Sequence, residues 1–338
     1  MPAEDAAGAA GTEGDQHSDR AGDDAVPLPT APFRRNAMQV TSADTPVVAL
    51  ARAERRAPMW VQALWRLLRT KPLGLFGLIV VLAMIGTALA APLIAPYDPA
   101  DPAARRFLTP SGDHLMGTDD KGRDIFSRVV YGARVAVAVG FGAVLISTAC
   151  ALIIGVTTGY FGGLVDALLQ RCVDAVMAFP GLVLLLALVS ITGSGLLRLI
   201  VILGLLSSAG ASRIVRSAVL AIRSAQYLEA ARAVGAGHAR IMLRHVLPNI
   251  FAPVMVSATV GLGGVILAEA SLSFLGLGIN DPRQPTWGQM LAQARRFLNT
   301  ELNYAVWPGL AITLAVFAFN MLGDALRDLL DPRLRAGR

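Results

Sequence analysis

Apolar residues gather in six long runs along this chain, separated by segments that hold most of the charges. The runs cover residues 73–95, 135–158, 175–192, 197–211, 250–272 and 306–323. A bilayer core is spanned by about 20 apolar residues in helical form, with a range of about 17 to 25. The runs therefore predict an all-helical integral membrane protein with six transmembrane helices. The fourth run is the shortest and is extended to residue 214 here. It either crosses the bilayer beside tilted neighbouring helices or crosses only half of it.

Composition agrees with a membrane protein and excludes several other classes. Of 338 residues, 54% are hydrophobic and only 16% are charged, against about 25% charged in an average globular protein. The two cysteines, Cys150 and Cys172, cannot form a disulfide framework. A soluble enzyme with one compact core, a disordered chain and a disulfide-stapled secreted domain are all excluded.

The positive charge lies beside the apolar runs and sets the expected topology. The formal net charge is +6, and nearly all basic residues are arginines that do not interleave with aromatic residues, so nucleic acid is not expected as a partner. By the positive-inside rule, the basic segments before the first run and between the fourth and fifth are cytoplasmic. Six spans then place both termini in the cytoplasm and loop 96–132 outside a bacterial cytoplasmic (inner) membrane. The second basic segment holds Arg213, Arg216, Arg223, Arg232, Arg240 and Arg244.

The region before the first run has a different composition. Its start is acidic and rich in Ala and Gly, and it lacks the basic start and apolar stretch of a signal peptide. Such a segment buries too little apolar surface to offset its ordering entropy. We predict a disordered cytoplasmic tail at 1–57 and a transmembrane domain at 58–335.

The sequence has no motif for covalent chemistry. A phosphate-binding loop of the form G-x-x-x-x-G-K-[ST] requires a lysine after glycine, and Lys71 and Lys121 follow Thr70 and Asp120. The four histidines have no metal-ligand spacing, and no G-x-S-x-G elbow occurs. We therefore expect no catalytic residue, no metal and no cofactor, and energy for transport must come from a partner.

Ionisable residues are scarce within the runs, and none lies near the centre of one. A buried charge costs about 2.5 to 3.5 kcal/mol on insertion scales and is kept mostly for function. Glu269, near the outer end of the fifth run, is therefore a candidate for a translocation path or gate, together with Ser271 and Asn320. Alternatively, Glu269 is an interface residue that reaches lipid headgroups or a neighbouring loop.

Small residues and prolines also recur in the runs. Glycines at four-residue spacing predict close helix packing, and prolines remove helix hydrogen bonds. These residues are Gly155, Gly159, Gly163, Pro180, Pro253 and Pro308.

Residues 226–248 form the more informative of two loops. They predict short helices at 227–234 and 238–246, broken at Gly235, with Pro248 opening the fifth run. From spacing alone, this is an amphipathic connector resting on headgroups. However, the segment has the pattern E-A-A, three further residues and then G, followed later by L-P. This pattern resembles the coupling motif of ABC importer permeases. The resemblance implies that the segment seats in a groove of an ATPase and transmits its closure. The implied contact residues are Glu229, Ala230, Ala231 and Gly235, with Leu247 and Pro248 ending the motif.

The second loop, before the second run, resembles the G-T-D-x-x-G-R-D-x-x-S-R signature of the dipeptide/oligopeptide permease group, in its C-type subunit. The matching residues are Gly117, Thr118, Asp119, Gly122, Arg123, Asp124, Ser127 and Arg128. Thr118 or Asp119 is expected to cap a helix, which would lie on the outer membrane surface over residues 125–130. The charged residues form either a solvated turn with local ion pairs or a surface that helps to receive a substrate-binding protein.

Further stretches agree with the same family, so the resemblance covers about residues 58–335. They include 159–163, 178–180, 268–278, 287–288 and 320–333. The resemblance implies a type I ABC importer (MetI-like) permease fold in the lipid bilayer. It also implies a homologous second permease, two ABC ATPase subunits and an extracytoplasmic peptide-binding protein as partners, with di- or oligopeptides moved inward by alternating access.

Other functions stay open. An ATP-independent secondary transporter or channel is disfavoured by the lack of mid-span ionisable residues, and a membrane anchor by the scattered Gly and Pro. Within the family, glutathione or a nickel chelate are alternative cargoes.

Overall fold

The computed structural model describes residues 71–330, which belong to one of two units of the chain, Ala57–Arg338. The predicted tail at 1–57 lies outside the described residues, as do both ends of the predicted transmembrane domain. The described part is helical between its loops, and its strand pairing is one bridge between Thr118 and Asp124. The predicted all-helical class is confirmed.

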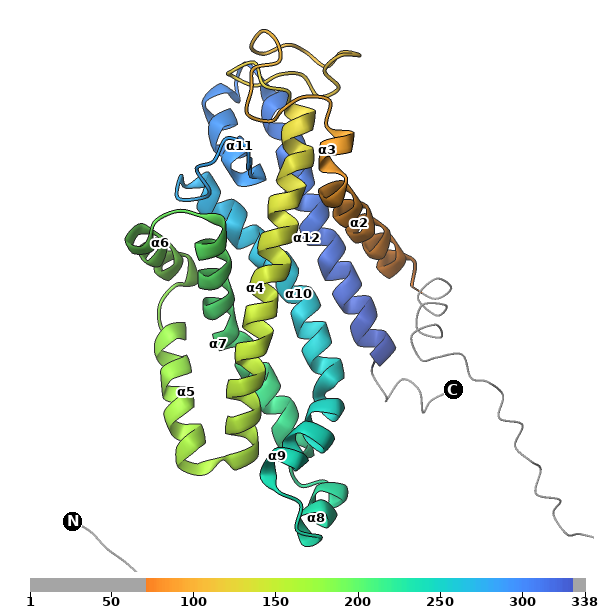
Figure 1. Ribbon diagram of the computed structural model, residues 1–338, viewed down its shortest axis with the longest axis vertical. Helices are drawn as coiled ribbons and strands as arrows, with labels where there is room; N and C mark the ends of the chain where they lie inside the picture. Colours follow the sequence, from red (N-terminus) through yellow and green to blue (C-terminus); the bar gives the residue numbers. More distant parts are fainter. Residues whose placement is uncertain (1–70, 331–338) are drawn as a thin grey trace, which may run out of the picture. The chain divides into compact units, whose positions relative to one another are not determined.

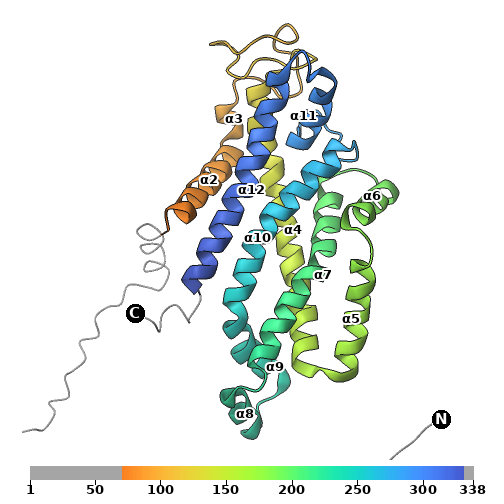
Figure 2. The same cartoon turned by 180° about the vertical axis from the view of Figure 1, so that it is seen from behind.

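Within residues 71–330, five helices are long and apolar enough to cross a membrane. Four are α2 (Pro72–Leu89), α4 (Ile125–Phe161), α7 (Leu196–Ile222) and α12 (Leu302–Leu330), and the fifth comprises α9 (His238–Ile241), η1 (Met242–Val246) and α10 (Leu247–Phe274). The shorter elements are α3 (Ala91–Ile94), α5 (Gly163–Met177), α6 (Gly181–Thr192), α8 (Gln226–Ala233), α11 (Trp287–Ala294) and η2 (Arg295–Phe297). In Figures 1 and 2, α4 lies along α7, and α10 along α12.

The described unit has two ends, which differ in structure (Figure 1). Residues 95–124 and α11 lie at one end, called the loop end below, and α8 lies at the other. One apolar cluster joins α2, α4, α10, α11 and α12, a second joins α4, α6, α7 and α10, and a third lies beneath α8. The third cluster positions the segment that resembles the coupling motif.

The third predicted span is wrong in its position. Residues 175–177 end α5, a turn follows at 178–180, and α6 has only 12 residues. The two helices meet at 85° and are long and apolar enough to span only as a pair. The reason is Pro180, the residue before α6, whose ring blocks a continuous helix.

Two ion pairs attach α5 to α7. Arg216 donates two hydrogen bonds to the carboxylate of Asp166, at 2.7 and 2.6 Å, and Arg213 pairs with Asp174. These acids are the partners of two arginines in the basic segment used for the topology. That segment is therefore partly neutralised by contacts that the linear charge pattern does not show.

The second predicted span extends well beyond its apolar run. Residues 125–130, expected as a separate surface helix, are the first turns of the 37-residue α4. The predicted cap is also wrong: the Asp124 side chain accepts a hydrogen bond from the Ser127 amide and begins the helix. Gly162, with φ of 67°, ends it.

The fifth span begins earlier than predicted. The expected helix at 238–246 does not stop but runs through the π-helical turn η1 into α10. Pro248 lies just after this turn and has no amide hydrogen to donate to the carbonyl of Arg244. A widened turn accommodates that missing donor.

The fourth run is a full helix, α7, of 27 residues rather than a half-span.

Glycines bring α4 and α7 into close contact, as predicted from their spacing. A Cβ atom on Gly155 would lie 2.6 Å from Cβ of Val215 and 2.7 Å from the carbonyl oxygen of Ser212. One on Gly159 would lie 2.7 Å from Cβ of Val219. The third glycine, Gly163, meets no atom within 4 Å and instead begins α5 with φ of 57°.

Gly155→Ala is expected to lower the thermal stability of the detergent-solubilised protein, by about 1 to 3 kcal/mol, because the methyl group overlaps backbone and cannot be accommodated by a rotamer change. Gly210→Ala on α7 is the matched control, since its Cβ meets nothing within 4 Å. Alanine there gains helix propensity of up to about 1 kcal/mol. Equal melting temperatures for the two variants would contradict close packing of α4 on α7.

Candidate functional site

The α8 segment is held to the helix bundle by one deeply buried side chain. Leu228 is fully buried against Val219, Ile241 and Val246 of the third apolar cluster. Ala231 and Leu247, two residues of the resembled motif, pack at the edge of the same cluster. The segment is therefore a fixed projection of the bundle.

Gly235 follows α8 and ends it with a tight turn. Its φ is +80°, in the left-handed region that favours glycine. The Gly235 amide donates to the carbonyl of Arg232, and the Ala236 amide donates to the carbonyl of Ala231. This pair of bonds is a Schellman motif, which satisfies carbonyls at the helix end and reverses the chain.

The remaining motif residues are exposed. Glu229, Ala230 and Gly235 face solvent, and Glu229 makes no ion pair with another described residue. Val234 is 88% exposed, so this projection carries apolar surface as well as charge. Pro248 is exposed as well, on the first turn of α10. The structure thus separates the motif into anchoring residues and a free face.

Contacts from α4 support the α8 segment. The Tyr160 hydroxyl lies 3.0 Å from Nδ1 of His238, and the guanidinium of Arg232 lies 5.6 Å from the centre of the Tyr160 ring. Sequence reasoning gave no role to Tyr160, His238 or Leu228. The only signal for Tyr160 was its place in the stretch 159–163.

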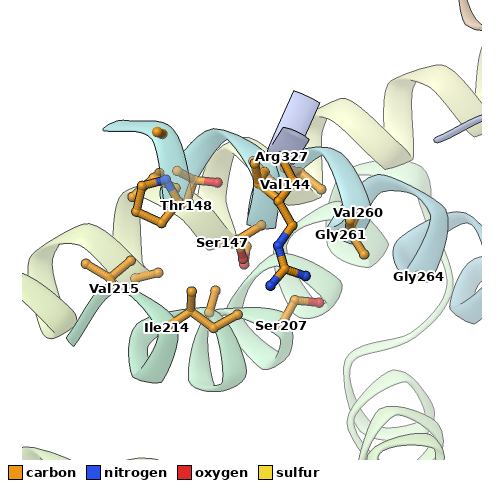
Figure 3. A pocket seen from close by; sticks show the side chains of 18 of the residues that line it. Val144, Ser147, Thr148, Ser207, Ile214, Val215, Val260, Gly261, Gly264 and Arg327 are labelled. Atoms are coloured by element: carbon orange, nitrogen blue, oxygen red, sulfur yellow. The ribbon is translucent and has the colours of Figure 1, made fainter. Parts of the chain in front are cut away.

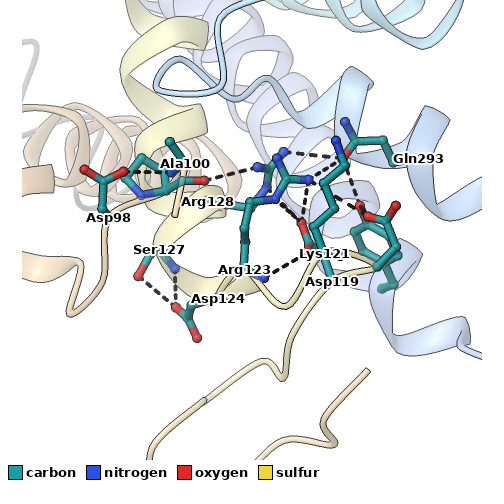
Figure 4. A network of polar contacts seen from close by, with 12 residues as sticks. Asp98, Ala100, Asp119, Lys121, Arg123, Asp124, Ser127, Arg128 and Gln293 are labelled. Carbon is teal, nitrogen blue, oxygen red and sulfur yellow. Dashed lines mark hydrogen bonds and ion pairs between the residues drawn. The ribbon is translucent and has the colours of Figure 1, made fainter. Parts of the chain in front are cut away.

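At the loop end, the signature residues form a buried polar network (Figure 4). Asp119 accepts hydrogen bonds from the amides of Lys121 and Arg123 and from Nε of Arg123, at 2.7 to 2.9 Å. Nε of Arg128 lies 3.7 Å from the same carboxylate. Both guanidiniums also donate to Oε1 of Gln293 on α11. Asp119 therefore links the loop to α4 and α11.

A second buried acid lies beside this network. Asp124 accepts from the amide and hydroxyl of Ser127 and lies 3.0 Å from Nδ1 of His114. The Ser127 hydroxyl in turn accepts from the Tyr97 amide. Thr118 is also buried, donating from its hydroxyl to the carbonyl of Arg105.

The two glycines of the signature have a packing role. Both have positive φ, 79° for Gly117 and 78° for Gly122. A Cβ on either would lie 2.3 Å or less from a backbone carbonyl oxygen. Glycine is required for the loop to fold on itself at these points.

The structure rejects the solvated turn expected as one alternative for this signature. Asp119 and Asp124 are completely buried, and Arg123 and Arg128 are at most 5% exposed. Their hydrogen bonds are made to the loop, α4 and α11, so the side chains are not free to receive a partner protein. The cause is the distant α11 and α12, whose Gln293 and Tyr304 cover the charges.

Two of the three predicted translocation-path residues, Ser271 and Asn320, bond only within their own helices, whereas Glu269 also bonds to Thr286 in the loop before α11. Glu269 is buried and accepts from the hydroxyl of Ser273 at 2.6 Å, so of the two contacts expected for it the structure has the one with a neighbouring loop, at Thr286, and not one with lipid headgroups. Ser271 donates to the carbonyl of Leu267, and Asn320 donates to the carbonyl of Val316. They are not brought together at one site, and their role in a path stays a prediction.

A large pocket opens elsewhere, between four helices (Figure 3). Its volume is about 770 Å³, and its walls come from α4, α7, α10 and the end of α12. The lining is mostly apolar, with hydroxyls from Ser147, Thr148, Ser207 and Ser257 and one guanidinium, Arg327. None of the predicted path residues lines it.

Comparison with known proteins assigns the family. Residues 151–336 match the family described as binding-protein-dependent transport system inner membrane component. Residues 59–110 match the N-terminal TM domain of oligopeptide transport permease C. The first match alone covers more than half of the chain.

Similar proteins agree with these matches. The dipeptide transport system permease protein DppC of Alkalihalophilus pseudofirmus is 40% identical over 279 residues, 82% of this chain and 91% of that protein. The di/tripeptide transport system permease protein DppC of Pseudomonas aeruginosa is 37% identical over 285 residues, which are 82% of this chain and 94% of that protein. The glutathione transport system permease protein GsiD of Escherichia coli is 40% identical over 273 residues, which are 80% of this chain and 90% of that protein.

The matches confirm the family that the sequence resembles. The segment at 226–248 lies within the first match, whereas the loop signature at 117–128 lies between the two. They also agree with the five spanning helices and the bent pair of the structure. Such a permease component is a non-catalytic, multi-pass inner membrane protein without a cofactor, and works with ATPase subunits and a binding protein. The chain belongs to the inner membrane components of binding-protein-dependent transport systems, as an ABC importer permease of the oligopeptide permease C type.

Proposed function

We propose that this chain imports short peptides together with a homologous second permease, two ATPase subunits and an extracytoplasmic peptide-binding protein. The printed names of its relatives support this substrate class, since they include dipeptide, di/tripeptide and glutathione systems. Glutathione is itself a tripeptide with free carboxylates. Short peptides with a free carboxyl group are therefore the cargo common to them.

The geometry of the α8 segment carries the proposal. A coupling element must transmit force without deforming, and must keep a free surface for its partner. Leu228 and the Schellman turn at Gly235 provide the rigidity, and Glu229, Ala230 and Val234 provide the exposed surface. ATP-driven closure of the ATPases would move this projection as a rigid body and, through α7 and α10, rock the bundle.

The same assignment orients the chain. If α8 contacts an ATPase, it is cytoplasmic, and the loop end lies outside. The exposed arginines beside α8 favour that side by the positive-inside rule. Both termini would then be cytoplasmic.

Reconstitution tests the proposal directly. Proteoliposomes that contain the assembled importer should take up radiolabelled dialanine only when both ATP and the binding protein are supplied. The same vesicles without ATPase subunits should show no uptake above background. Dialanine transport by this chain in the absence of ATPases would instead establish an ATP-independent transporter.

A further inference from the structure

The pocket shown in Figure 3 contains hydroxyl groups that have no hydrogen-bond partner in the described part of the chain. Ser147 and Thr148 on α4, Ser207 on α7 and Ser257 on α10 all line it. No other described residue accepts from or donates to these hydroxyls. They come from three helices that converge on one space.

Hydroxyls elsewhere in the same helices behave differently. Thr157 and Thr158 on α4 donate to carbonyls three or four residues earlier, as do Ser208, Ser212 and Ser217 on α7 and Thr259 on α10. This back-bonding is the usual way in which a helix satisfies Ser and Thr. The pocket hydroxyls are therefore free to bond to a molecule inside the pocket.

One positive charge completes the pocket. Arg327, on the last turn of α12, directs its guanidinium into the pocket, on the side where Ser147 and Ser207 lie (Figure 3). Among the described residues it forms no ion pair, and the adjacent Asp328 pairs with Lys71 instead. A guanidinium binds a carboxylate through two parallel hydrogen bonds, which a single neutral group cannot replace.

The structure assigns this pocket as a binding site for a short peptide in transit, with Arg327 binding the C-terminal carboxylate and the four hydroxyls binding the peptide backbone. The assignment rests on the proposed function and extends it to the residues that contact the cargo.

The chemistry of the lining favours a peptide over a lipid chain. A hydroxyl both donates and accepts, so it can bind peptide N–H and C=O groups whatever the side chains are. The apolar walls, which include Val144, Ile214 and Val260, accept varied side chains without specific bonds. A volume of about 770 Å³ lies within the range of about 300 to 1,000 Å³ for small-molecule sites.

The position of the pocket suits the inward step of transport. Its lining on α10 runs from Ala252 to Val265, just past the middle of the helix, and it includes the last turn of α12. In the proposed orientation the pocket therefore extends from the middle of the membrane toward the cytoplasm. A peptide held there has passed the loop end and awaits release.

Calorimetric titration of the purified permease–ATPase complex, without binding protein, tests the role of Arg327. Trialanine and trialanine amide are the probes, since they differ only in the terminal carboxylate. The wild-type complex should bind trialanine about tenfold more tightly than the amide, because the amide loses a charge-assisted bond. Arg327→Gln should remove that difference in affinity by weakening the binding of trialanine alone. Arg327→Lys should restore part of the difference.

Matched controls separate the pocket from general effects. Arg171→Gln on α5 removes an exposed arginine outside the pocket and should leave both affinities unchanged. Ser207→Ala should weaken both probes several-fold, because backbone contacts are common to them. Ser217→Ala on the same helix removes a hydroxyl that already bonds to Ile214 and should have no effect.

The possible results distinguish this assignment from the proposed function. If the wild-type importer transports dialanine with ATP but Arg327→Gln leaves the ratio of the two affinities unchanged, the pocket assignment is wrong. The same conclusion follows if neither probe binds, as when the second permease or a lipid fills the pocket. Loss of ATP-dependent uptake in the wild-type importer would instead contradict the proposed function.

Discussion

Gly235→Pro is expected to abolish ATP-dependent peptide uptake while the chain still inserts into the membrane. Proline holds φ near −65° and has no amide hydrogen. Gly235 has φ of +80° and donates to the carbonyl of Arg232, so both features of the turn are lost. The α8 projection would then lose its fixed direction. Uptake in proteoliposomes and binding of the ATPase by size-exclusion chromatography measure the two effects.

Gly237→Ala is the control for this variant. Gly237 has φ of −65°, which alanine adopts readily, and its Cβ would meet no atom within 4 Å. Uptake should stay within twofold of the wild-type rate. Wild-type uptake by the Gly235→Pro importer would show that the α8 turn does not couple ATP hydrolysis to transport.

Charge reversal tests the free surface without altering the turn. Glu229→Arg changes an exposed side chain that has no partner among the described residues, so folding should be unaffected. If the ATPase surface that faces Glu229 is positive, the introduced arginine meets a charge of its own sign, which costs several kcal/mol of binding free energy. We expect ATPase binding to weaken at least tenfold, and unchanged binding would place the contact elsewhere.

Asp119→Ala is expected to destabilise the loop end by about 3 to 5 kcal/mol, the usual effect of removing one partner of a buried ion pair. The carboxylate is completely buried and faces Arg123 at 2.7 Å and Arg128 at 3.7 Å. Without it, two guanidiniums are left close together with too little negative charge. Hydrogen exchange at 99–128 and the temperature of thermal inactivation measure the loss.

Asp120→Asn is the matched control at the neighbouring position. The Asp120 side chain is 24% exposed, lies 3.9 Å from Arg123, and accepts from the Tyr304 hydroxyl, an interaction that asparagine keeps. Partly exposed pairs contribute about 0 to 1 kcal/mol, so the variant should unfold close to the wild-type temperature. Equal losses for the two variants would mean that Asp119 is not the centre of the network.

Hydropathy predicted the long helices well because spanning a bilayer is a local requirement. Each apolar run from 73 to 95, 250 to 272 and 306 to 323 is found within a long helix or, for the first, in α2 and α3. It failed where a helix continues into polar sequence, as α4 does at residue 125, or where a proline divides a run, as at Pro180. Apolar character marks the membrane crossing and not the end of a helix.

The candidate sites were predictable to different degrees. The turn at Gly235 followed from its place after a short helix, since glycine is the usual residue for a left-handed helix end. The burial of Asp119 did not, because a run of charged residues in a loop looks solvated until distant residues cover it. Gln293 and Tyr304 do so from more than 160 positions away. The pocket could not be predicted from the sequence either, because its Ser and Thr residues differ from those bonded to their own helix only in their three-dimensional surroundings.

The sequence by itself determined the membrane class, the long helices and the family of this permease, because bilayer hydropathy and short motifs depend on neighbouring residues. Only the tertiary structure decided which polar groups are buried, which are paired and which are free. Those properties depend on contacts between helices far apart in the chain. Thus Asp119 became part of a sealed network at the loop end, whereas Arg327 was left facing an open pocket.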